Sequence, residues 1–134
     1  MKVVVVSGYF DPIHVGHLEL IEKAKLLGDK LIVILNNDNQ LFMKRGKGPF
    51  MGQEDRKKLL EAIRFVDEVF ISIDKDRSIC ESLRVVKPDV FANGGDRHRG
   101  EVPETPVCRA LGIEMVDGQG EKIASSRDYY LNEE

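Results

Sequence analysis

Hydrophobic residues recur along this chain in two alternating patterns, short continuous runs and longer stretches with helical spacing. Residues 2–7 read KVVVVS and residues 30–35 read KLIVIL. Continuous β-branched runs of this length are typical of strands buried on both faces of a parallel sheet. Apolar residues spaced three or four apart, such as Leu20, Ala24 and Leu27, instead predict an amphipathic helix.

Together the two patterns predict five strands that alternate with helices. The remaining strands are expected over 68–73, 89–92 and 113–116, and the helices over 15–27, 53–65, 78–86 and 104–111, with a last short helix that begins near Ser125. This alternation predicts an α/β fold with a single doubly wound parallel sheet of the Rossmann-like type. The polar segment 36–51 is expected to be a long loop. At 134 residues, the chain has the size of one domain that spans residues 1–134.

Composition and charge exclude several classes of protein. Hydrophobic residues make up 42% of the chain and charged residues 32%, and the formal net charge is −3. A general nucleic-acid binder would normally carry a basic excess. No apolar run approaches the length of a membrane span, and no signal-peptide pattern is visible. Cys80 and Cys108 lie far apart outside any metal or disulfide motif, so we expect a reduced, cytoplasmic protein.

The turn after the first strand carries the densest group of chemically active residues, GYFDPIHVGH over residues 8–17. His14 and His17 lie three apart where the predicted strand gives way to a helix. The N-terminus of a helix attracts phosphate, and imidazole N–H groups can donate hydrogen bonds to phosphate oxygens. Gly16 lets a ligand approach the backbone closely. On the residues alone two alternatives stay open, a metal site that includes Asp11 and an ordinary helix start.

The same ten residues match every fixed position of the pattern G-x-F-D-x-x-H-x-G-H. This pattern resembles the signature of the cytidylyltransferase-like nucleotidyltransferases, which transfer a nucleoside monophosphate from CTP or ATP to a phosphorylated acceptor and release pyrophosphate. The resemblance implies that His14 and His17 are catalytic and stabilise the α- and β-phosphates in the transition state. It also implies nucleotide binding by the other residues of the turn, namely Gly8, Tyr9, Phe10, Asp11 and Gly16.

The resemblance extends over almost the whole chain. After the second strand the family keeps a lysine that reaches the triphosphate, and both Lys44 and Lys47 fit that position. We take Lys44 as catalytic and Lys47 as nucleotide-binding. Arg56 and Arg64 fall on the two arginine positions of the family and, eight residues apart, would share one face of the helix predicted over 53–65. Arg64 is expected to bind the nucleotide, whereas Arg56 could serve the site or pair with Gln53 or Glu54 within its helix.

Two further motifs lie in the last third of the chain. The turn NGGD after the fourth strand would approach the base or ribose. The segment IASSR near the C-terminus resembles the last motif of the family and implies a catalytic Arg127, although Ala124 replaces the first hydroxyl residue of that motif. The nucleotide-binding residues that these two motifs imply are Asn93, Gly94, Gly95, Asp96, Ser125 and Ser126.

The implied chemistry is a direct in-line attack of the acceptor phosphate on the α-phosphorus. The attacking phosphate is already ionised at neutral pH, so no general base is required. Mg²⁺ is the expected cofactor. It would bridge phosphates with few or no protein ligands, and Asp11 is the candidate carboxylate near it. No activated serine or cysteine is visible, so no covalent intermediate is expected.

The identity of the base rests on partial likenesses. The segment IRFVDEV around Arg64 is most similar to glycerol-3-phosphate cytidylyltransferases, and we therefore expect transfer of CMP from CTP. The NGGD turn instead resembles heptose-phosphate adenylyltransferases, and SSR resembles archaeal FAD synthetases, which use ATP. An adenylyltransferase is therefore the alternative reading. The acceptor would be a small phosphorylated or phosphonate compound.

A non-catalytic nucleotide sensor on the same fold is a less favoured reading. A sensor need not keep groups that act on the transition state, such as His14, His17 and a loop lysine. The expected partners are a nucleoside triphosphate and a small acceptor, with no nucleic acid and no membrane. We also expect a homodimer.

Overall fold

The computed structural model describes residues 1–93 and 102–117. Its centre is a five-stranded sheet in the order β3-β2-β1-β4-β5, and every neighbouring pair of strands is parallel. The strands are β1 (Val3–Gly8), β2 (Lys30–Leu35), β3 (Glu68–Ile71), β4 (Val90–Ala92) and β5 (Glu114–Val116). The chain builds outward from β1 to β3 and then crosses back to β4, so the switch point lies between β1 and β4. The predicted α/β fold with a doubly wound parallel sheet is confirmed.

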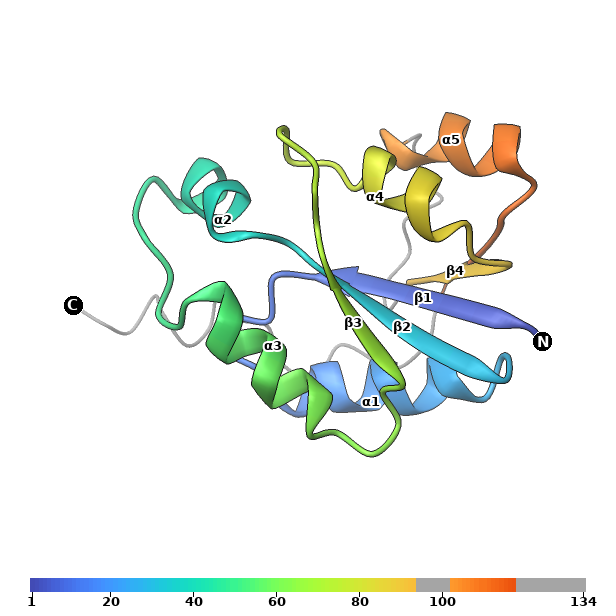
Figure 1. Ribbon diagram of the computed structural model, residues 1–134, viewed down its shortest axis with the longest axis horizontal. Coiled ribbons are helices and arrows are strands. Elements are labelled where there is room, and N and C mark those ends of the chain that lie inside the picture. The colour runs from blue at the N-terminus through green and yellow to red at the C-terminus, as the bar shows by residue number, and fades with distance from the viewer. Residues whose placement is uncertain (94–101, 118–134) are drawn as a thin grey trace.

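Helices cover both faces of the sheet (Figure 1). On one face lie α1 (Val15–Lys25) and α3 (Gln53–Glu61), and on the other lie α4 (Cys80–Val86) and α5 (Glu104–Leu111). Alternation along β1 supplies both cores: Val4 and Val6 pack with α1 and α3, whereas Val5 packs with α4 and α5. The continuous valine run therefore reflects burial on both faces of the sheet.

The polar segment after β2 was expected to be a long loop, and this prediction is wrong. The segment contains the helix α2 (Asp38–Arg45). Asn37 caps its start: the Asn37 side chain accepts a hydrogen bond from the Gln40 N–H, and the Gln40 side chain accepts one from the Asn37 N–H. Gly46 ends the helix at φ 77°. Hydrophobic spacing gave no signal because Leu41 is its one buried apolar residue.

Three helices are shorter than predicted, since α1 ends at Lys25, α3 ends at Glu61 and α4 begins at Cys80, whereas α5 has the predicted bounds 104–111. The short helix expected near Ser125 lies outside the described residues. Within the described ranges, no helix has the length and apolar content needed to cross a membrane.

Candidate functional site

A cavity of about 560 Å³ opens at the carboxyl ends of the strands. This is the edge of a parallel sheet where ligands bind in doubly wound folds. Its walls come from the ends of β1 and β2, from α2, from the segment between β3 and α4, and from the start of α5. The lining residues are Ser7, Gly8, Tyr9, Asn36, Lys44, Asp76, Arg77, Ser78, Ile79, Val102, Pro103 and Glu104.

His14 and His17 cap the start of α1 reciprocally. His14 is the N-cap residue, and its Nδ1 accepts a hydrogen bond from the Gly16 N–H at 3.1 Å. Nδ1 of His17 accepts one from the His14 N–H at 3.2 Å. The two rings stack with their centroids 3.7 Å apart. Because each Nδ1 accepts a hydrogen bond, the neutral form of each ring carries its proton on Nε2 and keeps Nε2–H as a donor.

The surroundings of His17 favour the neutral ring. Burial, the adjacent His14 and the cationic Lys44 together lower the pKa of His17 from 6.5 to about 3. The edge of the Phe10 ring packs against His17 at 4.7 Å between centroids. His17 is therefore a neutral hydrogen-bond donor at physiological pH.

Gly8 and Phe10 shape this turn from within. Phe10 is 1% exposed and has φ 51°, in the left-handed region. A Cβ at position 8 would lie 3.1 Å from the Phe10 ring. The missing side chain of Gly8 therefore makes room for Phe10, while Gly8 also lines the cavity. Phe10 belongs to the core and supports His17.

Asp11 holds the segment between α2 and α3. Its Oδ2 accepts hydrogen bonds from Arg45 Nη1 at 3.1 Å and the Phe50 N–H at 2.8 Å, and its Oδ1 accepts one from the Met51 N–H at 2.9 Å. The carboxylate is 1% exposed. Both oxygens are thus committed to protein donors, which contradicts the expected place of Asp11 beside Mg²⁺. Among the described residues, no three His, Cys, Asp or Glu side chains are grouped as metal ligands.

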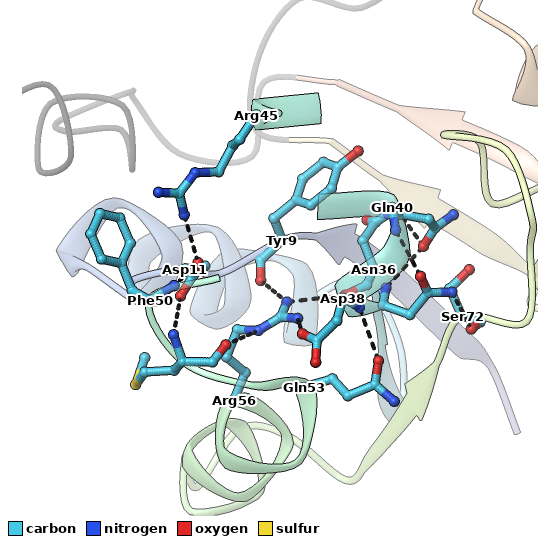
Figure 2. A network of polar contacts seen from close by, with 12 residues as sticks. Tyr9, Asp11, Asn36, Asp38, Gln40, Arg45, Phe50, Gln53, Arg56 and Ser72 are labelled. Carbon is cyan, nitrogen blue, oxygen red and sulfur yellow. Dashed lines mark hydrogen bonds and ion pairs between the residues drawn. The ribbon is translucent and has the colours of Figure 1, made fainter. Parts of the chain in front are cut away.

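Arg56 joins the turns that follow β1 and β2 (Figure 2). Its guanidinium is fully buried and donates to the carbonyls of Tyr9 at 2.6 Å and Asn36 at 3.0 Å. It also donates to the Met51 carbonyl at 2.9 Å and to Asp38 Oδ1 at 2.5 Å. Sequence reasoning considered Arg56 for the site or for a pair within its helix. The structure instead gives it a structural role at the base of the site.

The structure separates the two candidate lysines. Lys44 lies in the last turn of α2 and lines the cavity, with its Nζ 4.3 Å from the centre of the Tyr9 ring. Its charge also acts on His17. Lys47 follows the C-cap residue Gly46, is exposed, and is not among the lining residues. The structure therefore brings Lys44, and not Lys47, together with Tyr9 and His17.

Arg64 lies at the opposite edge of the sheet. It follows the end of α3 and precedes β3, which starts at Glu68. The nearby Asp67 bonds the Leu31 N–H at the start of β2, which marks the amino edge. Arg64 is exposed and stacks on Phe65. The nucleotide-binding role expected for Arg64 does not fit this placement, and α3 ends too early for Arg56 and Arg64 to share a helical face.

Asn93 follows β4 directly, on the far side of the switch point. It is buried, and its N–H donates to the Val116 carbonyl at 2.7 Å. Its side-chain Nδ2 has no hydrogen-bond partner within the described part of the chain. The other residues expected around the nucleotide lie outside the described residues, namely Gly94, Gly95, Asp96, Ser125, Ser126 and Arg127.

Sequence reasoning missed the segment between β3 and α4, which forms one wall of the cavity. Arg77 and Ser78 line the cavity from this segment, and Glu104 lines it from the start of α5. The signal was available, because the segment follows the carboxyl end of a parallel strand. Its residues match no motif, however, whereas the recognisable motifs lie in the turns after the first, second and fourth strands.

A doubly wound sheet with a histidine-capped helix and a cavity beside it is an arrangement suited to binding the phosphates of a nucleotide. Comparison with protein families agrees, since residues 5–119 match the family described as cytidylyltransferase-like. The chain belongs to this cytidylyltransferase-like family.

Individual proteins similar to this chain include FAD synthases and a bifunctional protein. The chain is 45% identical over 131 residues to an FAD synthase of Pyrococcus abyssi, which covers 98% of this chain and 82% of the relative. It is 41% identical over 113 residues to an FAD synthase of Ferroglobus placidus, covering 84% and 72%. It is 32% identical over 123 residues to the bifunctional protein HldE of Desulfatibacillum aliphaticivorans, covering 91% of this chain but only 23% of that protein.

A solved structure is also similar. The lipopolysaccharide core biosynthesis protein from Thermoplasma volcanium superposes with a TM-score of 0.73 at 28% identity, covering 87% of this chain and 95% of that one. The expected preference for CTP is not confirmed by any of these proteins. FAD synthases and HldE fit the alternative reading, adenylyl transfer, better.

Proposed function

We propose that this protein is an adenylyltransferase, which transfers AMP from ATP to a small phosphate monoester and releases pyrophosphate. FMN is the first acceptor to test, because FAD synthases are 45% and 41% identical to the chain. The observation that carries the proposal is the reciprocal histidine cap. It leaves the Nε2–H group of each neutral ring as the remaining donor at the N-terminus of α1, next to a turn that lines the cavity.

In this reaction an oxygen of the acceptor phosphate attacks the α-phosphorus in line. The bond between the α-phosphorus and the bridging oxygen breaks, and pyrophosphate leaves with that oxygen. The attacking group is already anionic, so positioning and electrostatic stabilisation supply the catalysis. His14 and His17 donate hydrogen bonds to the phosphates from α1, and the start of that helix adds its own positive potential. Lys44 supplies a full positive charge from α2.

Mg²⁺ would enter with the substrate as the Mg·ATP complex. The described residues offer no grouped metal ligands, and Asp11 is committed to the protein. Mg²⁺ keeps several waters and often binds mainly through phosphates, so a nucleotide-borne ion fits this chain. Residues 1–134 would act as one nucleotidyltransferase domain, and the homodimer stays a prediction.

A sugar 1-phosphate is the second acceptor to test. The NGGD turn is similar to heptose-phosphate adenylyltransferases, and HldE is 32% identical to the chain. The chain spans about a quarter of HldE, so only the matching part supports this reading.

The test is pyrophosphate release in mixtures of ATP or CTP with FMN, a hexose 1-phosphate or glycerol 3-phosphate, with the product identified by mass spectrometry. We expect release with ATP, the mass of an adenylylated acceptor, and little release with CTP. Turnover with CTP and not with ATP would contradict the proposal and support a cytidylyltransferase. Binding of nucleotide without any release of pyrophosphate would instead support the sensor reading.

A further inference from the structure

Arg77 stands out among the cations of the cavity because its charge is unmatched. It lies between β3 and α4, lines the cavity and is exposed. Its guanidinium makes no hydrogen bond or ion pair with any residue that the structure describes. Most other arginines of the described ranges differ: Arg45, Arg56 and Arg84 each pair with a carboxylate, and Arg64 stacks on a ring.

The backbone on both sides of Arg77 is held by one buried side chain. Nε2 of Gln40 donates to the Asp76 carbonyl at 2.7 Å and to the Ser78 carbonyl at 2.8 Å. Gln40 is fully buried, and its Oε1 accepts from Asn36 Nδ2 and from the Asn37 N–H. Gln40 lies in the first turn of α2, the helix that ends with Lys44 and Arg45. The position of Arg77 is therefore fixed relative to the helix that carries Lys44.

Further hydrogen bonds hold the same segment, some within it and one from α5. The Ser78 N–H and hydroxyl donate to Asp76 Oδ1 at 2.9 and 2.6 Å. The Ile79 N–H donates to Oε2 of the buried Glu104 at 3.1 Å. The two carboxylates that line the cavity are thus bonded to the segment itself. A solvated surface arginine requires no such support, whereas a guanidinium that recognises a ligand requires a fixed base.

We propose that Arg77 binds the phosphate group of the acceptor substrate and so determines that the acceptor is a phosphate monoester. The inference rests on the proposed function, which it deepens by assigning a cation to the second substrate. A guanidinium matches the geometry of a phosphate with two parallel hydrogen bonds. Lys44 lines the same cavity beside Tyr9, so an acceptor phosphate would lie between two cations contributed by different elements.

The test compares Arg77→Gln with Lys75→Gln in the full chain. Lys75 lies in the same segment and is exposed but does not line the cavity, so its variant removes the same charge from the same region. Binding is measured without ATP, with FMN against riboflavin by fluorescence and with glycerol 3-phosphate against glycerol by thermal shift. In steady-state assays the KM for the acceptor and the KM for ATP are measured separately.

We expect Arg77→Gln to weaken binding of the phosphorylated probes by about 10- to 100-fold, the effect of losing charge-assisted hydrogen bonds. Riboflavin and glycerol should bind as before, and the KM for the acceptor should rise while the KM for ATP stays unchanged. Lys75→Gln should behave as wild type, and Arg77→Lys should lie between wild type and Arg77→Gln.

Three results would overturn the inference. The wild-type protein would bind the phosphorylated probes no better than their dephosphorylated partners, or Arg77→Gln would bind them as wild type does, or Lys75→Gln would lose as much affinity. The proposed function fails differently. If phosphate binding depends on Arg77 but no acceptor receives AMP from ATP, the anion site is supported and the adenylyltransferase is not.

Discussion

His14 and His17 fix each other's ring orientation at the start of α1. His17 Nδ1 accepts a hydrogen bond from the His14 N–H at 3.2 Å, and the two rings stack with their centroids 3.7 Å apart. In an ordinary capping box a Glu or Gln side chain at the third helical position makes that bond. Here an imidazole makes it, and its second nitrogen takes no part in the cap. On the proposed function, one pair of side chains both starts the helix and supplies hydrogen-bond donors to the phosphates.

This double role can be divided by substitution at His17. Gln at position 17 can still accept from the His14 N–H but offers no imidazole Nε2–H, whereas Ala offers neither group. We expect His17→Gln and His17→Ala both to lower kcat by about 10²- to 10³-fold, with a much smaller change in the KM for ATP. Only His17→Ala should also lose about 1 kcal/mol of stability in urea unfolding. A wild-type kcat in His17→Gln would remove His17 from the catalytic residues.

The lowered pKa of His17 predicts a pH dependence of stability. In the unfolded chain His17 takes up a proton as the pH falls below 6.5, whereas in the folded chain it does so only near 3. The unfolded state binds more protons between these values, so this contribution to stability is complete above pH 6.5 and declines as the pH falls toward 3.

Urea unfolding at several pH values between 7.5 and 4.5 measures this effect. The wild-type protein should lose more unfolding free energy over that range than His17→Gln, which has no titrating group at the position. Parallel curves for the two proteins would contradict the assignment of a neutral, buried His17.

Substitutions of Lys44 and Lys47 form a matched pair that tests which lysine binds the triphosphate. Lys44→Gln should lower kcat by about 10²-fold or more, because Lys44 lines the cavity beside Tyr9 and supplies a charge to the transferring phosphates. Lys47→Gln removes the same charge three residues further along and should change kcat by less than about threefold, as expected for a position outside the cavity. Steady-state kinetics with saturating acceptor decides between them, and a reversed order would give the triphosphate to Lys47.

The fold could be predicted from the sequence because its central strands are continuous runs of apolar, largely β-branched residues, at 3–6 and 30–35. The place of His14 and His17 at the start of a helix could be predicted because their motif directly follows the first strand. The helix α2 could not, since polar capping by Asn37 and Gln40 defines it and not an apolar face. The placement of Arg64 at the amino edge follows from its position just before β3, because the crossover between two parallel strands returns the chain to that edge.

Residues that act through the backbone were the hardest to find. Gln40 and Arg56 are fully buried, and most of their side-chain hydrogen bonds go to backbone groups, four of which are carbonyls of segments distant in sequence. Such partners have no side-chain identity and leave no pattern of residue types. From sequence alone, a polar residue in a short helix is predicted to be exposed to solvent, because its neighbours in space are not known.

Arg56 should be one of the most sensitive positions for stability. Arg56→Met would leave the carbonyls of Tyr9, Asn36 and Met51 without this donor and would leave Asp38 without its partner. We expect a loss of about 3 kcal/mol or more in urea unfolding. Arg84→Met is the control, because the exposed pair of Arg84 with Glu81 should contribute about 0.5 kcal/mol or less. Equal losses in the two variants would show that Arg56 does not hold the site together.

Substitution of Asp11 tests whether its carboxylate has a structural role or binds Mg²⁺. In Asp11→Asn one amide oxygen replaces two carboxylate oxygens, so the variant loses its charge opposite Arg45 and at least one of the bonds to the Phe50 and Met51 N–H groups. We expect a stability loss of about 1–3 kcal/mol. The Mg²⁺ concentration that gives half-maximal activity should match that of wild type, because the oxygens of Asp11 face the protein and the ion arrives with ATP. A carboxylate that bound Mg²⁺ would instead raise that concentration by about 10-fold or more when replaced. Titration of Mg²⁺ at fixed ATP, on variant protein shown by circular dichroism to be folded, measures the difference, and a large shift would return Asp11 to the metal site.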